Sequence, residues 1–392
     1  MLSVNILDST FRKDPYPTYA AVRGTPGLVQ VQPGPMWAVS RYDEAVEVFK
    51  NTTAFSSQGL RVATTTSWLP NNPLAESIVL FDPPRHTGIR AVLAHAFSNR
   101  VLPRIEPLAR NFSRSFAARA KSGAVIDVAV DLAMLPAAVI GNLLGYEGDP
   151  QRIRQWSECI VAVNEFTPEH LRNEIIREFE ALTSCIQSMF ADRKQARRDD
   201  LASDLLDAEV DGVRLDDAEL LGFMYLLIVA GFDTTAHLLS NALRILSSRP
   251  ALIKRLQNKP DDIPTFLEEV LRFETSVHNT MRVAVQDVTI GTTPVAAGSL
   301  VVLLLGAINR DESRYTNPEE FDMDRKQRPS MSFGHGIHFC LGAPLARAEA
   351  RIALEEILPH IEGITLVDEP EWNTSMTVRG TTHCRMQFHP RT

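Results

Sequence analysis

A cysteine inside a glycine-rich segment is the clearest sign of chemistry in this sequence. The segment SFGHGIHFCLGAP covers residues 332–344 and places Gly334, Gly336 and Gly342 around Cys340. Glycines at this density allow tight turns and a close approach of the backbone to a flat ligand. A cysteine held in such a loop, with amide N–H groups able to point at its sulfur, is suited to bind iron as a thiolate.

Two other interpretations of this loop stay open on the residues alone. A lone cysteine is usually a small, buried, hydrophobic residue. Zinc is the second alternative, because His335, His338 and Cys340 could supply three ligands. Structural zinc sites are closed by four ligands, and no fourth candidate lies nearby in the sequence.

A second unusual segment lies inside the longest helical pattern, residues 216–248. Asp216 has the residue type of an N-cap, with Glu219 at the spacing of a capping box. The apolar run of this helix is interrupted by AGFDTT, residues 230–235. A mid-helix glycine costs about 1 kcal/mol relative to alanine, and buried Asp and Thr side chains cost more unless they are hydrogen-bonded. Such exceptions point to function, and the alternative is a kinked core helix.

The spacing within this segment brings small and polar residues together. Ala230 and Thr234 share one face of the helix, and Gly231 lies about one turn before Thr234. Small residues there would let a flat ligand approach the backbone. The Thr234 hydroxyl can bond to the preceding turn or to a ligand.

Two cationic side chains stand near the start of another predicted helix. The segment DPPRHTGIR, residues 82–90, has prolines in the entry turn of a helix. His86 and Arg90 are four residues apart and therefore share a face, which suits a pair of carboxylates. From spacing alone, a solvated basic face is the favoured interpretation.

Taken together, these motifs resemble those of the cytochromes P450, the heme-thiolate monooxygenases. F-x-x-G-x-H-x-C-x-G at 333–342 resembles the heme-binding signature, and A-G-x-D-T-T at 230–235 resembles the oxygen-activation motif. D-P-P-x-H-x-x-x-R at 82–90 and E-x-x-R at 269–272 match two more motifs, in the family's order. The resemblance covers nearly the whole chain. It implies a mainly α fold with small β-sheets and with heme between the long central helix and the cysteine loop.

The resemblance also implies roles for single residues. Cys340 is expected to be the proximal iron ligand of heme b, and thiolate ligation favours O–O cleavage. Asp233 and Thr234 are expected to organise proton delivery during oxygen activation, with Thr235 as a weaker candidate. The residues expected to hold the heme or its propionates are His86, Arg90, Ala230, Gly231, Arg282, Phe333, His338, Cys340 and Gly342.

By the same resemblance, Glu269 and Arg272 form buried structural support behind the cysteine loop and are not catalytic. The family often has a proline shortly after this motif, where the chain has TSVH at 275–278. That departure concerns the shape of the substrate pocket and not the chemistry. The segments in which substrate contacts are expected, without single residues being assigned, are 58–78, 150–198 and 375–378.

Composition bounds the class of protein. The 392 residues carry 40 Lys and Arg against 48 Asp and Glu, a net charge of −8, which argues against a nucleic-acid-binding protein.

No linker or repeat divides the sequence, so we expect one domain over 1–392. The four scattered cysteines indicate a reducing compartment. No signal or anchor stands at the start, and the apolar run 220–232 is shorter than the ~18 residues of a membrane span. We therefore expect a cytoplasmic monomer.

The expected partners follow from the resemblance and from what the sequence lacks. We find no nucleotide fingerprint, so electrons are expected from a ferredoxin and an NAD(P)H-dependent ferredoxin reductase. The expected substrate, beside dioxygen, is an apolar terpenoid, steroid, fatty acid or polyketide that is hydroxylated at a C–H bond. A peroxide-driven heme-thiolate enzyme and a non-catalytic heme sensor are the alternatives. The arginines expected to gather near the cysteine and attract an acidic ferredoxin are Arg90, Arg100, Arg104, Arg347 and Arg351.

Overall fold

The computed structural model describes residues 4–6, 8–32, 34–97, 101–165, 167–326 and 329–391. The chain divides into two compact units, each built from separate stretches of sequence. Unit 1 comprises Met1–Ser56, Arg110–Ala133 and Thr234–Thr392, and unit 2 comprises Ser57–Ala109 and Met134–Asp233. Because the two units interleave along the chain, neither is a continuous domain. The expectation of a single domain over 1–392 stays a prediction.

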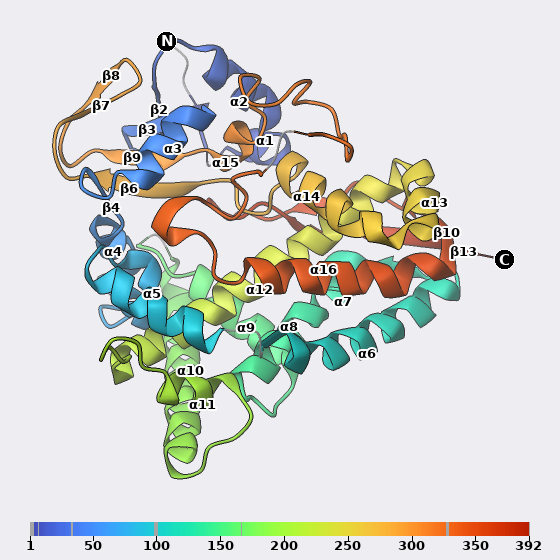
Figure 1. The fold of residues 1–392 in the computed structure, drawn as a ribbon, viewed down its shortest axis with the longest axis horizontal. Helices are drawn as coiled ribbons and strands as arrows, with labels where there is room; N and C mark the ends of the chain where they lie inside the picture. Colours follow the sequence, from blue (N-terminus) through green and yellow to red (C-terminus); the bar gives the residue numbers. More distant parts are fainter. Residues whose placement is uncertain are drawn as a thin grey trace. The chain divides into compact units, whose positions relative to one another are not determined.

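The main sheet of unit 1 has six strands in the order β1-β2-β3-β9-β6-β4 (Figure 1). Strands β2 and β3 pair antiparallel and form a hairpin. β3 then pairs parallel with β9, with Trp37 opposite Val301. The strand bounds in this sheet are β1 Val4–Asn5, β2 Val29–Gln32, β3 Met36–Val39, β9 Leu300–Leu303, β6 Thr280–Ala284 and β4 Phe55–Ser56.

Both faces of this sheet are buried under helices. Along β9, Val301 and Leu303 belong to a core cluster that includes Phe49 of α3 (Tyr42–Lys50). Val302, which points to the opposite face, belongs to a second cluster with Tyr19 of α2 (Tyr16–Gly24). This alternation follows the two-residue period of a strand. The sheet is therefore a rigid support for the segments that leave it.

Three smaller sheets complete the β-structure of unit 1 in the described residues. β5 (Val125–Asp127), β10 (Ile361–Leu366) and β13 (Arg385–Pro390) form one sheet. The other two are hairpins: β7–β8 (Val288–Ile290 and Thr293–Val295) and β11–β12 (Glu371–Trp372 and Thr381–His383). The remaining helices of unit 1 are α1 Ser9–Lys13, α7 Val128–Asp131, α13 Pro250–Asn258, α14 Ile263–Phe273, α15 Leu305–Ile308 and α16 Ala343–Ile357. Helices α14 and α16 lie side by side (Figure 1).

Unit 2 is helical in its described residues, apart from turns and short 3₁₀ segments. Helix α9 packs against both α8 and α10, and α11 packs against α5, α8 and α10. The helices are α4 Arg61–Thr64, α5 Arg85–Ala96, α8 Met134–Leu144, α9 Pro150–Val161, α10 Glu169–Gln195 and α11 Leu201–Asp207. The residue ranges of the two units meet within α6 (Val101–Lys121) and within α12 (Asp217–Ser247).

Helix α12 is the longest helix predicted from the sequence, and its start is confirmed. The Asp216 side chain accepts a hydrogen bond from the Glu219 backbone N–H at 2.8 Å. The Glu219 carboxylate accepts one from the Asp216 N–H at 2.9 Å, which completes the capping box. α12 is long and apolar enough to cross a membrane, but most of its apolar stretch is buried inside the structure, as in the core helix of a globular protein.

Candidate functional site

Two glycines shape the cysteine loop, which we define as residues 332–342. Gly334 and Gly336 have φ angles of 73° and 69°, in the left-handed region that side chains rarely adopt. A Cβ on Gly336 would lie 2.6 Å from the carbonyl oxygen of Phe49 in α3. Glycine at this position therefore allows the loop to lie directly against α3.

Hydrogen bonds connect this loop to helix α14. The Cys340 N–H donates to the carbonyl oxygen of Phe333 at 2.9 Å. The neighbouring Ser332 hydroxyl donates to the carbonyl oxygen of Leu271 in α14 at 2.6 Å. The Asn309 side-chain amide donates to the same hydroxyl at 2.9 Å. The place of Cys340 is thus fixed by the helix that carries the E-x-x-R motif.

The E-x-x-R motif forms buried structural support, as predicted. The Glu269 and Arg272 side chains are each 2% exposed and share hydrogen bonds of 2.8 and 2.7 Å. Arg272 also donates to the carbonyl oxygen of Asn309 at 3.0 Å, and Arg325 lies 3.4 Å from Glu269. Both charges are paired and bonded to backbone, so removal of either partner would leave an uncompensated buried charge. Their function is to hold the segment that precedes the cysteine loop.

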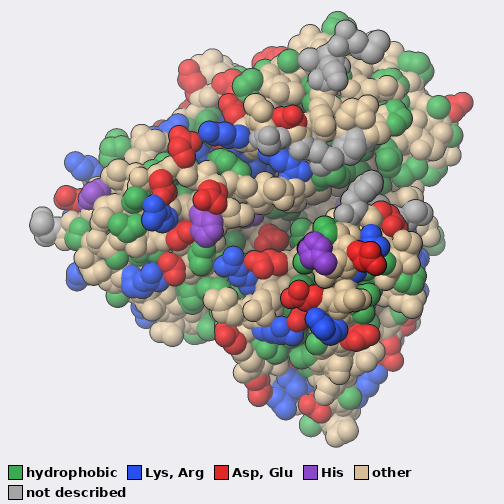
Figure 2. Space-filling view, turned by 180° about the vertical axis from the view of Figure 1, so that it is seen from behind, with side chains coloured by type: hydrophobic (Ala, Val, Ile, Leu, Met, Phe, Trp, Pro, Cys, Tyr) green, Lys and Arg blue, Asp and Glu red, His purple; other side chains and the backbone are tan. Residues whose placement is uncertain are grey.

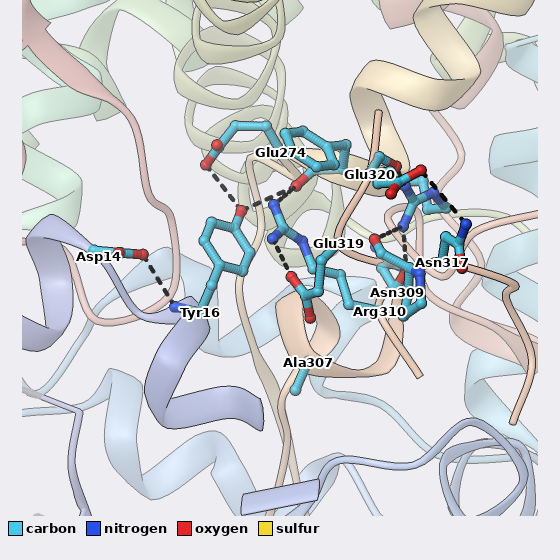
Figure 3. Close-up of polar contacts among 12 residues, drawn as sticks. Asp14, Tyr16, Glu274, Ala307, Asn309, Arg310, Asn317, Glu319 and Glu320 are labelled. Carbon is cyan, nitrogen blue, oxygen red and sulfur yellow. Dashed lines mark hydrogen bonds and ion pairs between the residues drawn. The ribbon is translucent and has the colours of Figure 1, made fainter. Parts of the chain in front are cut away.

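A second polar cluster, drawn in Figure 3, holds the same segment to α2. Arg310 donates to the Glu319 carboxylate at 2.6 Å and to the carbonyl oxygen of Phe273 at 2.7 Å. Its guanidinium carbon lies 3.4 Å from the ring centre of Tyr16, a cation–π contact. The Tyr16 hydroxyl donates to the Glu274 carboxylate at 2.9 Å (Figure 3).

Glu274 is a buried carboxylate that binds two arginines. Arg244 lies 2.7 Å from one oxygen, and Arg379 forms an ion pair with the other. Burial alone would raise the pKa of Glu274, but the charges of Arg379 and Arg244 outweigh it and lower the pKa to about 2. Arg379 also donates to the carbonyl oxygens of Arg12 and Lys13, at 2.9 and 2.8 Å. The loop 373–380 is thereby attached to α1.

Cys340 stands in different surroundings from the other three cysteines. It is half-buried, and a Cβ on Gly342 would lie 3.9 Å from its sulfur. Cys384 is buried, and burial raises its pKa to about 11. Burial also raises the pKa of Cys159 and of Cys185. These three thiols are kept protonated, which disfavours them as metal ligands.

The zinc alternative finds no support in the described part of the chain. There, no group of three His, Cys, Asp or Glu side chains is placed to hold a metal ion. His335 and His338 both lie in the cysteine loop and are half-buried. The described part of the loop therefore offers a single thiol, and not a closed four-ligand cage.

The predicted propionate-binding residues are divided between the two units. His86 and Arg90 lie on α5 of unit 2, where His86 is buried and Arg90 half-buried. Arg282, on β6 of unit 1, is buried with its guanidinium carbon 5.5 Å from the ring centre of Phe49. His338 is half-buried in the cysteine loop. The roles predicted for these four side chains remain proposals.

The A-G-x-D-T-T segment lies in the middle of α12, as predicted. Ala230 is exposed although Ile228 and Phe232 beside it are buried, so there is open space next to the helix at this point. Gly231 faces another way, because its added Cβ would stand 2.3 Å from the side chain of Ile140 in α8. Ala230 therefore leaves room for a flat group, whereas Gly231 is required for packing against α8, a reason that the sequence did not provide.

Asp233 and Thr234 follow in the same stretch of helix. Both are half-buried, and Thr235 is buried. Burial of the Asp233 carboxyl, together with the nearby negative charge of Glu158, raises its pKa to about 6. Ser157 donates a long hydrogen bond of 3.5 Å to this carboxyl. An acid with a pKa near 6 can both accept and release a proton close to neutral pH.

Ser157 was not identified from the sequence. It lies on the apolar face of α9, 76 residues before Asp233, where a serine carries no distinguishing pattern. The only possible signal is the pair Arg154 and Glu158 on either side of it, whose i,i+4 spacing is that of an ordinary surface ion pair.

The predicted basic surface is largely neutralised by local ion pairs. Arg104 pairs with Asp199 and Asp204, Arg347 pairs with Glu268 at 2.5 Å, and Arg351 pairs with Glu355 at 2.6 Å. Arg100 lies outside the described residues. Figure 2 likewise shows basic and acidic side chains interspersed over one face. Arg347 also covers the Phe333 ring, with 4.4 Å between its guanidinium carbon and the ring centre.

Comparisons with known proteins agree with this arrangement. Residues 23–377 match the family model described as "Cytochrome P450". The chain is 35% identical to erythromycin C-12 hydroxylase of Saccharopolyspora erythraea over 356 residues, 89% of this chain and 88% of that enzyme. It resembles the solved structure of CYP109Q5 from Chondromyces apiculatus with a TM-score of 0.90, 31% identity and 99% coverage of both chains. CYP109E1 from Bacillus megaterium, solved in complex with testosterone, gives a TM-score of 0.85 at 31% identity, with 95% and 99% of the two chains covered.

Proposed function

Because this chain belongs to the cytochrome P450 family, we propose that it hydroxylates a C–H bond of an apolar small molecule. Proteins of this family bind heme b and oxygenate organic substrates. The bound heme supplies the iron at which dioxygen is reduced and its O–O bond is broken. The protein must hold the heme, deliver protons and position the substrate.

We propose Cys340 as the iron ligand, and the geometry of its loop is the observation that carries this role. The loop lies against α3, is hydrogen-bonded to α14 through Ser332, and presents a half-buried thiol. Phe333, held by Arg347, shields one side of the loop. A fixed thiolate with an aromatic neighbour is suited to bind iron while water is kept away from the sulfur.

The propionates require cationic partners, and four side chains are proposed for them: His86, Arg90, Arg282 and His338. His86 and Arg282 are buried side chains with N–H groups that can donate hydrogen bonds to a carboxylate. On α12, the exposed surface at Ala230 supports a flat group beside this helix. Gly342 supports the same arrangement at the cysteine, because it places no side chain against the sulfur.

Proton delivery is proposed for Asp233 and Thr234, which are adjacent on α12. Asp233 takes up a proton and passes it on, since its pKa of about 6 lies close to neutral pH. The half-buried Thr234 hydroxyl, next along the helix, donates the proton on the open side of α12. A hydroxyl can act in this way because it donates and accepts at once.

The substrate class is proposed from the relatives. Erythromycin C-12 hydroxylase is named for a macrolide, and CYP109E1 was solved with a steroid. We propose a bulky apolar molecule of steroid or polyketide type, ahead of a terpenoid or a fatty acid. Electrons are proposed to come from a ferredoxin and its NAD(P)H-dependent reductase in the cytoplasm, because the sequence contains no nucleotide fingerprint.

The test combines spectroscopy with turnover. The reduced carbon monoxide complex of the wild type should absorb as a thiolate-bound heme, and Cys340→His should lose that absorption. Cys185→Ser is the matched control, because Cys185 is also half-buried but lies in α10, and it should retain the absorption. With a surrogate ferredoxin and reductase, NADPH oxidation should depend on substrate and yield hydroxylated product. Retention of the thiolate absorption in Cys340→His would contradict the ligand assignment.

A further inference from the structure

The Asp233 carboxyl of α12 faces helix α9 within unit 2. Ser157, which is 0% exposed, places its hydroxyl oxygen 3.5 Å from Asp233 Oδ2. One turn before and one residue after this serine, Arg154 and Glu158 form an ion pair of 2.8 Å. One hydroxyl and two opposite charges of α9 are thus close to a single acid on α12.

The three α9 side chains act on Asp233 in different directions. Apart from burial, Glu158 raises the pKa of Asp233, while the Ser157 hydrogen bond and the Arg154 charge lower it. Ile140 of α8, which packs on Gly231 and carries no charge, also lies against this part of α12. The three side chains that act on the Asp233 carboxyl in addition to burial, Glu158, Ser157 and Arg154, all come from α9.

We propose that Ser157 is a positioning residue for Asp233 and that the Arg154–Glu158 pair adjusts the acidity of that carboxyl. This inference rests on the proton-delivery role proposed above for Asp233. A hydroxyl is suited to both charge states of a carboxyl group, because it donates to the carboxylate and accepts from the protonated acid. Ser157 can therefore hold Asp233 in one orientation while the proton arrives and leaves.

Variants of the three α9 residues should shift the pKa of Asp233, some upward and one downward. Ser157→Ala removes a donor to the carboxylate, so the pKa of Asp233 should rise by about half a unit, as expected for the loss of one modest hydrogen bond. Arg154→Gln should also raise it, because a favourable positive charge is lost. Glu158→Gln should lower it, because a negative neighbour is lost.

The control is Arg152→Gln on the same helix. Arg152 pairs with Glu178 of α10 at 2.7 Å, and not with Glu158, the acid that raises the pKa of Asp233. Its removal should leave the titration unchanged. Ser157→Thr restores a hydroxyl and should return the pKa toward that of the wild type, provided that circular dichroism shows an unchanged fold.

Two readouts are used on the heme-loaded protein. The first is the infrared carboxyl band of Asp233 followed over pH and assigned by its loss in Asp233→Asn. The second is the rate of NADPH consumption over the same pH range with saturating substrate. The pH midpoints of both readouts should move upward in Arg154→Gln and downward in Glu158→Gln.

If neither midpoint moves while Asp233→Asn abolishes the pH dependence, the role of α9 is contradicted and that of Asp233 stands. If Asp233→Asn leaves the pH dependence of NADPH consumption unchanged, the proton-delivery role itself fails. Because Arg154 and Glu158 are partly exposed, their variants keep the test decisive even if Ser157→Ala does not fold.

Discussion

Gly336 approaches Phe49 so closely that a Cβ on the glycine would stand 2.6 Å from the Phe49 carbonyl oxygen. Gly336→Ala should therefore destabilise the cysteine loop twice, through this clash and through its φ of 69°. We expect a loss of about 1–3 kcal/mol in unfolding free energy and weaker heme retention. Thermal unfolding and the ratio of heme to protein after gel filtration provide the measurement.

Gly334→Ala separates the two causes of this loss. Gly334 has nearly the same φ, 73°, but its Cβ would have its nearest contact at 3.8 Å. The alanine variant there should show the backbone strain without the clash, and so a smaller loss. Equal losses at both positions would mean that the Phe49 contact contributes nothing.

Thr234 is expected to control how electrons are divided between product and peroxide. Thr234→Ala should keep the fold, the heme and substrate binding, because the side chain lost is small and only half-buried. Product formation should fall by about 10²-fold, the lower end of what positioned proton transfer contributes, while NADPH consumption continues and peroxide accumulates. Asp233→Asn should instead slow NADPH consumption itself.

Peroxide and product per NADPH, measured for both variants, test this division. The matched control is Thr235→Ser, which keeps a hydroxyl at the neighbouring buried position and should behave as the wild type. If Thr234→Ala forms as much product per NADPH as the wild type, Thr234 has no role in oxygen activation.

Glu274 should make the stability of unit 1 depend on acid. Its folded pKa of about 2 lies below the ordinary value of 4.5, so its contribution is present above pH 4.5 and disappears as the pH falls toward 2. Glu274→Gln leaves Arg379 and Arg244 without their carboxylate, which should cost about 3–5 kcal/mol at neutral pH. The difference in melting temperature between variant and wild type should narrow as the pH drops through this range.

Glu268→Gln serves as the control for Glu274→Gln, since Glu268 is a partly exposed carboxylate paired with Arg347. Glu268→Gln should change the free energy of unfolding by no more than about 1 kcal/mol. If the difference in melting temperature between Glu274→Gln and the wild type stays constant from pH 7 to pH 3, the buried ion pairs do not lower the pKa of Glu274.

The Arg347–Glu268 pair also allows a test of electron transfer. If an acidic ferredoxin docks near the cysteine loop, Arg347→Gln should slow reduction of the enzyme and Glu268→Gln should accelerate it. Both effects should fade as salt increases, because exposed charges are screened over about 10 Å at 0.1 M. Stopped-flow reduction at low and high salt measures this. Identical rates for both variants at low salt would place the docking surface elsewhere.

The sequence predicted local structure well wherever a motif or a period determined it. The capping box of Asp216 and Glu219 was found from spacing. The buried pair of Glu269 and Arg272 was found from the family resemblance, because its i,i+3 spacing alone is that of an ordinary surface pair. The apolar and β-branched residues at 281–288 suggest one continuous strand, but β6 ends at Ala284 and Val288 begins the separate hairpin β7–β8.

The contacts that a single sequence could not provide are those between distant helices. Ser157 reaches Asp233 and Ile140 reaches Gly231 only because α8, α9 and α12 pack together, and packing partners leave no pattern in one chain. Gly231 is the instructive position. Its motif correctly marked a special place in the helix, but its missing side chain makes room for an isoleucine.

The parallel pairing of β3 with β9 has a consequence for synthesis on the ribosome. Val301 is added 264 residues after its partner Trp37, so the β2–β3 hairpin is made long before the strand that covers its edge. An uncovered strand edge is a template for wrong pairing with other chains, and large proteins are most exposed to aggregation in such intermediates. Added chaperones that mask this edge until β9 is made should therefore raise the yield of folded protein.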